Sequence, residues 1–180
     1  GIIVPVGITN KESVKHPVFD KLKNKKILVY IGRLTKVKNV DKLILALKFL
    51  DNNYVLLIVG EGSEKTHLIN FTKRLELSLR VIFLGFQPSS NIIPYCHAVI
   101  LASSSEGLPH VVLESLKYNK PIFATHVGDI PRLIPDYLIL DNINPRYIAE
   151  KISKTKIRQT FFIPEQYYIS NIAKELDSIF

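Results

Sequence analysis

The sequence contains no methionine and only one cysteine, Cys96. A single cysteine cannot form an internal disulfide, and its place beside the apolar run 98–102 predicts buried packing rather than catalysis or metal binding. No apolar run approaches the roughly 18–20 residues that span a bilayer, and no segment has the charged start and cleavage site of a signal peptide. These absences exclude a disulfide framework and a membrane-spanning class, and we expect a cytoplasmic protein.

Metal and nicotinamide sites are also not expected. Histidine, cysteine and aspartate residues do not cluster at the spacing of metal ligands. The turn Gly60-Glu61-Gly62 follows the second apolar run rather than the first and lacks the third glycine of a dinucleotide fingerprint. We interpret it as a tight turn near a ligand.

The net charge of +8 is concentrated in one part of the chain. Between residues 11 and 48 there are eleven Lys or Arg residues and three acidic residues, which accounts for +8. Such a segment can attract anionic ligands, nucleic acid or an acidic membrane face. The alternative is that most of these lysines only keep the surface solvated. Aromatic residues are not interleaved with these lysines and no RNA-recognition signature is present, so nucleic acid is not an expected partner.

Short apolar runs alternate with helical patterns, which predicts an α/β fold with a doubly wound, mostly parallel sheet and helices on both faces. Most runs are continuous, as expected for strands buried on both sides. We expect six strands, at about 27–32, 54–59, 80–84, 97–102, 121–125 and 137–140. We expect helices at about 40–50, 63–77, 109–118, 145–155 and 165–178, the first with Asn39 as its N-cap.

Two carboxylates surround the predicted start of one helix. Glu106 lies in the preceding loop and Glu114 on the helix. Pro109 suits the first helical position, and Gly107 allows the backbone to approach a ligand closely. A helix advances roughly 7–8 Å from Pro109 to Glu114, so both carboxylates can border one small polar molecule such as a sugar. The alternative is a helix with one acidic residue before it and another on its solvated face.

A second motif follows the first predicted strand, where Arg33 and Lys38 come after an apolar run that ends at Gly32. In an open α/β sheet, ligands bind outside the carboxyl ends of the strands. The planar fork of arginine and the mobile charge of lysine suit the two phosphates of a diphosphate. Considered alone, a strand followed by basic residues more often reflects solvated lysines than a binding site.

Together these motifs resemble the retaining glycosyltransferases of the GT-B fold, family four, and in particular their C-terminal half, which binds the nucleotide sugar. The fold implied is one Rossmann-like half of a GT-B enzyme. The resemblance covers most of the chain, and its segments come in the family's order: 4–8, Gly32-Arg33-Leu34 with Lys38, 58–62, 81–85, Glu106-Gly107-Leu108-Pro109 with Glu114, 121–125 and 127–131.

The resemblance also implies a domain organisation. Residues 1–26 would form the interdomain segment and a polar approach, and residues 27–180 the donor-binding domain with its C-terminal helix. The family's N-terminal half, which binds the acceptor, is absent from this chain. We interpret the chain as a fragment or excised domain, the alternative being a natural start from which the initiator methionine was removed.

The resemblance assigns catalytic roles to three residues, Arg33, Lys38 and Glu106. The two cations would hold the donor diphosphate, and Glu106 would bind the donor sugar. The other implied donor contacts are Gly32, Gly62, Phe86, Gly107, Leu108, Pro109 and Glu114. Among these, Glu114 would bind the ribose, and Phe86 would pack on the base or, alternatively, in the core.

The function implied is transfer of a hexose from a nucleoside diphosphate sugar to an acceptor, with retention of configuration, in glycan biosynthesis. The nucleotide sugar is a substrate, and no cofactor is expected. The acceptor would be a glycan, lipid or small molecule bound by the missing half, so we expect the isolated chain to be inactive. The basic segment also suggests a peripheral contact with the cytosolic membrane face. Two alternatives stay open: a non-catalytic nucleotide- or phosphate-binding module, and a glycoside hydrolase with Glu106 and Glu114 as its carboxylate pair.

Overall fold

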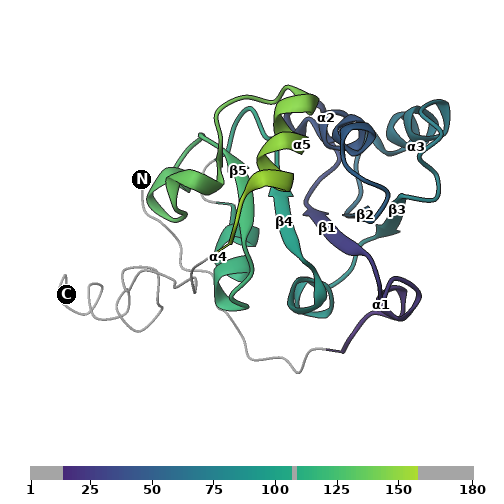
Figure 1. The fold of residues 1–180 in the computed structure, drawn as a ribbon, viewed down its shortest axis with the longest axis horizontal. Coiled ribbons are helices and arrows are strands. Elements are labelled where there is room, and N and C mark those ends of the chain that lie inside the picture. Colours follow the sequence, from purple (N-terminus) through teal and green to yellow (C-terminus); the bar gives the residue numbers. More distant parts are fainter. Residues whose placement is uncertain (1–13, 107–108, 158–180) are drawn as a thin grey trace.

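The computed structural model describes residues 14–106 and 109–157. Within them, one sheet has the strand order β3-β2-β1-β4-β5-β6, and every pair of neighbouring strands is parallel (Figure 1). The strands are β1 (Lys26–Ile31), β2 (Tyr54–Val59), β3 (Val81–Gly85), β4 (Ala98–Leu101), β5 (Ile122–Thr125) and β6 (Ile139–Leu140). The predicted α/β class and all six predicted strands are confirmed. The last strand is shorter than expected because Asp136–Leu138 form a 3-10 turn.

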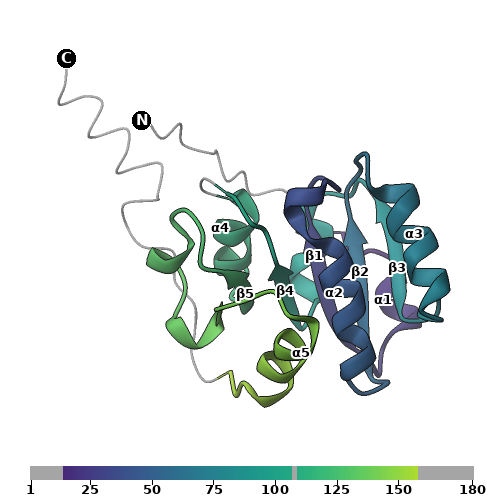
Figure 2. The same ribbon diagram turned by 90° about the horizontal axis from the view of Figure 1, so that it is seen from above.

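Helices cover both faces of the sheet, as predicted. They are α1 (Val18–Lys21), α2 (Val40–Ala46), α3 (Lys65–Arg74), α4 (His110–Lys117) and α5 (Pro145–Lys154). Helix α2 contacts both α3 and α5 along one face, whereas α4 packs beside β5 on the other face (Figure 2). None of these described helices is long and apolar enough to cross a membrane. The helix expected at 165–178 lies outside the described residues.

The core forms where the continuous apolar strands are covered from both sides. Every residue of β2, β4 and β5 is buried. Strand β3 lies at the edge of the sheet and is only partly covered after its first residue. Cys96 is also buried, which raises the pKa of its thiol to about 12 and confirms its expected packing role.

Of two predicted helix starts, one is confirmed and one is wrong. Asn39 is the N-cap residue of α2, as predicted, although its backbone is left-handed with φ 50° and its side chain makes no capping hydrogen bond. Pro109 has an extended backbone with ψ 120° and precedes α4, so it is not the first helical residue. Its carbonyl accepts a hydrogen bond from Val112 N–H at 2.9 Å, as the carbonyl of an N-cap residue does. The fixed φ of proline is compatible with this position as well as with the first turn.

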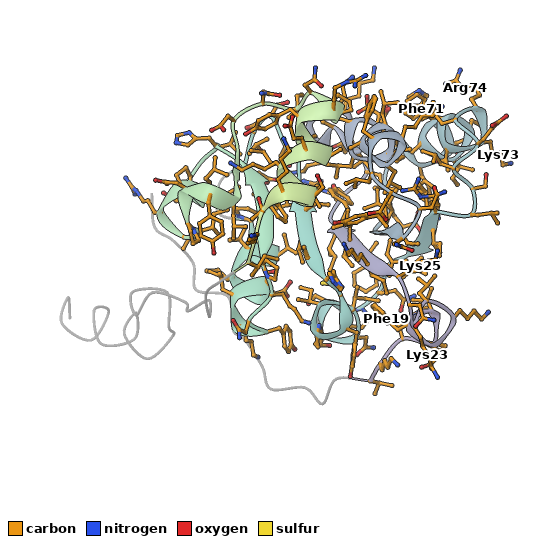
Figure 3. All side chains as sticks on the ribbon, viewed as in Figure 1. Phe19, Lys23, Lys25, Phe71, Lys73 and Arg74 are labelled. Carbon is orange, nitrogen blue, oxygen red and sulfur yellow. The ribbon has the colours of Figure 1, made fainter. Side chains whose placement is uncertain are left out.

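Strand β1 divides the basic segment between two ends of the sheet. Lys23 and Lys25 lie beside α1, where β1 begins (Figure 3). Arg33 and Lys38 follow β1 at its carboxyl end. The segment therefore does not form one basic patch, and only its second part lies where an open α/β sheet binds ligands.

The turn after β2 packs directly on the backbone of the loop after β1. Leu34 N–H donates to the carbonyl of Glu61 at 2.8 Å, and Glu64 N–H donates to the carbonyl of Leu34 at 3.0 Å. A Cβ atom added at Gly62 would lie 2.2 Å from Leu34 O and 2.6 Å from Leu34 N. Gly62 therefore allows a close approach of two backbones that any larger residue prevents.

We expect Gly62→Ala to lower the free energy of unfolding by about 1–3 kcal/mol, because the new methyl group meets backbone atoms that cannot turn away. Urea unfolding followed by circular dichroism measures this change. Ser63→Ala, at the exposed neighbouring position, is the control and should stay within about 0.5 kcal/mol of the unaltered chain. Equal stability of the two variants would contradict the close approach.

Candidate functional site

The order of strand addition reverses between β1 and β4. Strands β2 and β3 lie on one side of β1, and β4, β5 and β6 lie on the other. The loops that follow β1 and β4 therefore begin side by side at the carboxyl edge of the sheet. This reversal is the position at which open α/β sheets bind ligands. We call residues 32–39 and 102–106 the switch loops.

An ion pair joins the two switch loops. Lys38 Nζ donates to Glu106 Oε1 at 2.5 Å, and the two side chains are only 18% and 14% exposed. The buried Ser103 donates from its hydroxyl to the same carboxylate oxygen at 2.7 Å. The hydroxyl of Thr125, at the end of β5, donates to the carbonyl of Ser103 at 2.6 Å. The structure thus brings together the cation and the carboxylate that two separate motifs predicted.

The partial burial of this pair makes each charge dependent on a partner. Little water reaches Lys38 or Glu106, so a lone charge at either position would be poorly solvated. A ligand that contacts the pair can satisfy both groups, because lysine donates to anions and the carboxylate accepts from hydroxyls. The pair is therefore suited to a molecule that carries an anionic group beside several hydroxyl groups.

Arg33 lies in the same switch loop as Lys38 but is exposed. Within residues 14–106 and 109–157, its guanidinium has no hydrogen-bond or ion-pair partner. The backbone beside it is held by Tyr30, whose buried hydroxyl donates to the carbonyl of Arg33 at 2.8 Å. Burial, with a smaller effect from the Glu106 charge, raises the pKa of Tyr30, so this hydroxyl remains a donor. Gly32 leaves room for it, since a Cβ atom there would lie 2.9 Å from Tyr30 Oη.

Glu114 has different partners from Glu106. It lies on α4, close enough to the side chain of Ser89, in the 3-10 turn η3 (Ser89–Asn91), for that side chain to act on its pKa. Burial raises its pKa, and the Ser89 side chain, with the nearby His110 and Lys117, opposes that rise. The structure therefore places Glu114 against the segment that follows β3, whereas Glu106 contacts the loop after β1.

The remaining predicted site residues have varied environments. Phe86 follows β3 and is 81% exposed, so the alternative of core packing is wrong. Pro109 is buried beside the start of α4. Gly32 and Gly62 both lie at the carboxyl edge of the sheet, where they make room for Tyr30 and for the backbone of the loop after β1. Gly107 and Leu108 lie outside the described residues.

Sequence reasoning missed the roles of Asn39, Ser103 and Thr125 around the ion pair, and that of Tyr30, which bonds to the carbonyl of Arg33. Tyr30, Ser103 and Thr125 lie at or near the end of a strand, whereas Asn39 precedes α2. A hydroxyl or amide at the carboxyl end of a buried strand is a signal that could have identified them, because buried polar groups require partners. Among the described residues, no group of three His, Cys, Asp or Glu side chains could hold a metal ion.

Residues 12–174 match the family described as glycosyl transferases group 1. An uncharacterized glycosyltransferase of Methanocaldococcus jannaschii is 28% identical over 164 residues, which cover 77% of this chain and 46% of that protein. The N-acetyl-alpha-D-glucosaminyl L-malate synthase of Bacillus anthracis is 32% identical over 114 residues, which cover 62% of this chain and 30% of that protein. The chain thus spans less than half the length of these relatives.

Solved structures share the fold. HepE of Anabaena, crystallised with UDP and glucose, has a TM-score of 0.78 at 21% identity, over 89% of this chain and 51% of that one. The lipopolysaccharide outer core galactosyltransferase WaaB, in its apo form, has a TM-score of 0.70 at 24% identity, over 98% of this chain and 54% of that one. The described sheet and helices match one Rossmann-like half of these GT-B proteins.

We expect Glu114→Gln to stabilise the folded chain at neutral pH. Because burial raises the pKa of Glu114, the folded state keeps the carboxyl proton at pH values where the unfolded state has released it. Above its folded-state pKa the carboxyl is charged in the folded state, and this partly buried charge lowers the free energy of unfolding. Glutamine carries no charge and avoids that loss. Urea unfolding at several pH values should show a gain at pH 7 that disappears below the ordinary carboxyl value of 4.5.

Glu150→Gln is the matched control, because Glu150 is exposed on α5 and its pKa is lowered by Lys154. It should give no gain at neutral pH. A gain from Glu114→Gln that is the same at all pH values would contradict the stated cause.

Proposed function

The chain belongs to the glycosyl transferases group 1 family, and on that premise we propose that it binds a nucleoside diphosphate sugar as the donor half of a retaining glycosyltransferase. The observation that carries this proposal is the position of three groups at the strand-order reversal. Arg33 offers a guanidinium that has no partner among the described residues, and Lys38 and Glu106 form a partly buried pair between the same two loops. A relative of the same fold, HepE, has been crystallised with UDP-glucose, which supports a donor of this class.

The charges suit the departure of a diphosphate. When the bond between the sugar and the diphosphate breaks, negative charge develops on the departing oxygen. Arg33 and Lys38 would stabilise that charge through charge-assisted hydrogen bonds, and Arg33 can contact two oxygens at once. Preorganised donors of this kind contribute most when they are already in place before the bond breaks.

Glu106 would contact the sugar. In the ligand-free chain its carboxylate is already bonded to Lys38 and Ser103. When the diphosphate draws Lys38 toward its own oxygens, the carboxylate would accept hydrogen bonds from sugar hydroxyls in exchange. The ion pair would thus keep both groups satisfied until the donor replaces their mutual contact.

The nucleoside end would lie toward β3. Phe86 presents an exposed ring just beyond that strand and could stack on the base. Glu114, which lies near Ser89 in the segment after β3, would accept hydrogen bonds from the ribose hydroxyls. The two carboxylates contact different elements, and this favours two separate roles on one donor over a facing hydrolase pair.

The acceptor would be bound by the other half of a GT-B enzyme, and this chain alone would not transfer the sugar. Its relatives include a putative teichuronic acid biosynthesis glycosyltransferase of Bacillus subtilis, which supports a role in glycan biosynthesis with a glycan, lipid or small-molecule acceptor. We also propose retention of configuration, a cytoplasmic location and a peripheral contact with the cytosolic membrane face.

We expect calorimetric titration to detect binding of one among UDP, GDP and ADP. Lys38→Ala and Arg33→Ala should each weaken that binding about tenfold or more, because each removes a hydrogen bond from a charged donor. Lys25→Ala is the matched control, since Lys25 lies before β1 and donates to the carbonyl of Asn52. It should leave the affinity unchanged.

Circular dichroism of each variant separates loss of binding from loss of folding. Absence of binding to all three nucleotides at millimolar concentration would overturn the proposed donor-binding role of the chain. Binding that Lys38→Ala and Lys25→Ala weaken equally would place the nucleotide elsewhere.

A further inference from the structure

Two consecutive residues of the first switch loop bond to the second switch loop. The backbone N–H of Ser104 donates to the carbonyl of Val37 at 2.8 Å. The next residue, Lys38, forms the ion pair with Glu106. The loops are therefore joined by a backbone hydrogen bond and, one residue later, by the charged contact.

Asn39 adds a third connection from the third consecutive residue. Its side-chain amide donates from Nδ2 to the carbonyl of Ala102 at 2.8 Å and to the hydroxyl of Ser104 at 2.7 Å. Both hydrogens of the amide are used by the other switch loop. The neutral amide thus binds the loop on either side of the buried Ser103, which itself donates to Glu106.

The backbone at Asn39 is also specific. Its φ of 50° and ψ of 38° lie in the left-handed region, which glycine and asparagine adopt more readily than other residues. Glycine would keep this backbone but remove both side-chain hydrogen bonds. Asparagine alone among common residues supplies this backbone together with a neutral amide donor of this length.

We propose that Asn39 is a positioning residue that holds the turn carrying Lys38 against the loop carrying Glu106, so that both groups are in place when a diphosphate sugar binds, an inference that rests on the proposed function. The Lys38 side chain leaves the backbone immediately before Asn39, so the position of its ammonium group depends on where the turn is held. Asn39 fixes that turn to the strand end from which Glu106 follows. Misplacement of such groups by about 1 Å has a large effect on ligand-dependent chemistry.

Asn39→Gly tests this role, because it preserves the left-handed backbone and removes only the amide. Asn119→Gly is the matched control, since Asn119 also has a left-handed backbone, with φ 52°, but follows α4 at the opposite edge of the sheet. In the ligand-free chain, hydrogen exchange of the Ser104 amide should become at least about tenfold faster in Asn39→Gly and remain unchanged in Asn119→Gly.

Measurement of nucleotide affinity then tests whether Asn39 positions Lys38 for the ligand. Asn39→Gly should weaken binding of UDP, GDP or ADP about fivefold or more, and Lys38→Ala should cost much less in that background than in the unaltered chain. Such non-additivity is not expected if Asn39 only stabilises the fold. Unchanged exchange at Ser104 would overturn the connection between the loops, and additive losses of affinity would overturn the positioning of Lys38.

The two proposals fail in different ways. If the unaltered chain binds none of the three nucleotides, the proposed function and the binding half of this inference both fall, while the exchange measurement still decides whether Asn39 holds the loops together. If the unaltered chain binds and Asn39→Gly binds equally well, only the role of Asn39 is overturned.

Discussion

The partly buried ion pair between Lys38 and Glu106 is the contact on which the candidate site depends. Its two residues are 68 positions apart in the chain and meet because β1 and β4 are neighbours in the sheet. Ser103 supports the carboxylate, and Asn39 holds the lysine turn to the end of β4. Since neither charge is well solvated alone, the pair favours one arrangement of the two loops and keeps it ready for a ligand that can contact both groups.

The sequence was sufficient to predict the α/β class, the six strands and the helices on both faces, because continuous apolar runs alternate with helical patterns. It also predicted Lys38 and Glu106 as site residues. It could not predict that they bond to each other. That contact depends on the strand order, and the same alternating elements are compatible with many strand orders. It also depends on side-chain directions that the linear pattern does not contain.

The sequence also placed Asn39 correctly as the N-cap residue of α2, but not the partners of its side chain. The amide donates to the loop after the neighbouring strand β4 and makes no capping hydrogen bond to α2. Likewise, the basic segment is continuous in sequence, but β1 carries the chain from one end of the sheet to the other and separates Lys25 from Lys38. Residues that are close in sequence therefore lie apart in space.

Family membership and the geometry of the switch loops support the same account, in which a nucleotide sugar binds where the strand order reverses. Mapping backbone amide chemical shifts during titration with a nucleoside diphosphate tests this account most directly. The account predicts that the largest changes fall on the switch loops, around Arg33, Lys38 and Glu106. Largest changes around Lys23 and Lys25, at the opposite end of β1, would contradict it.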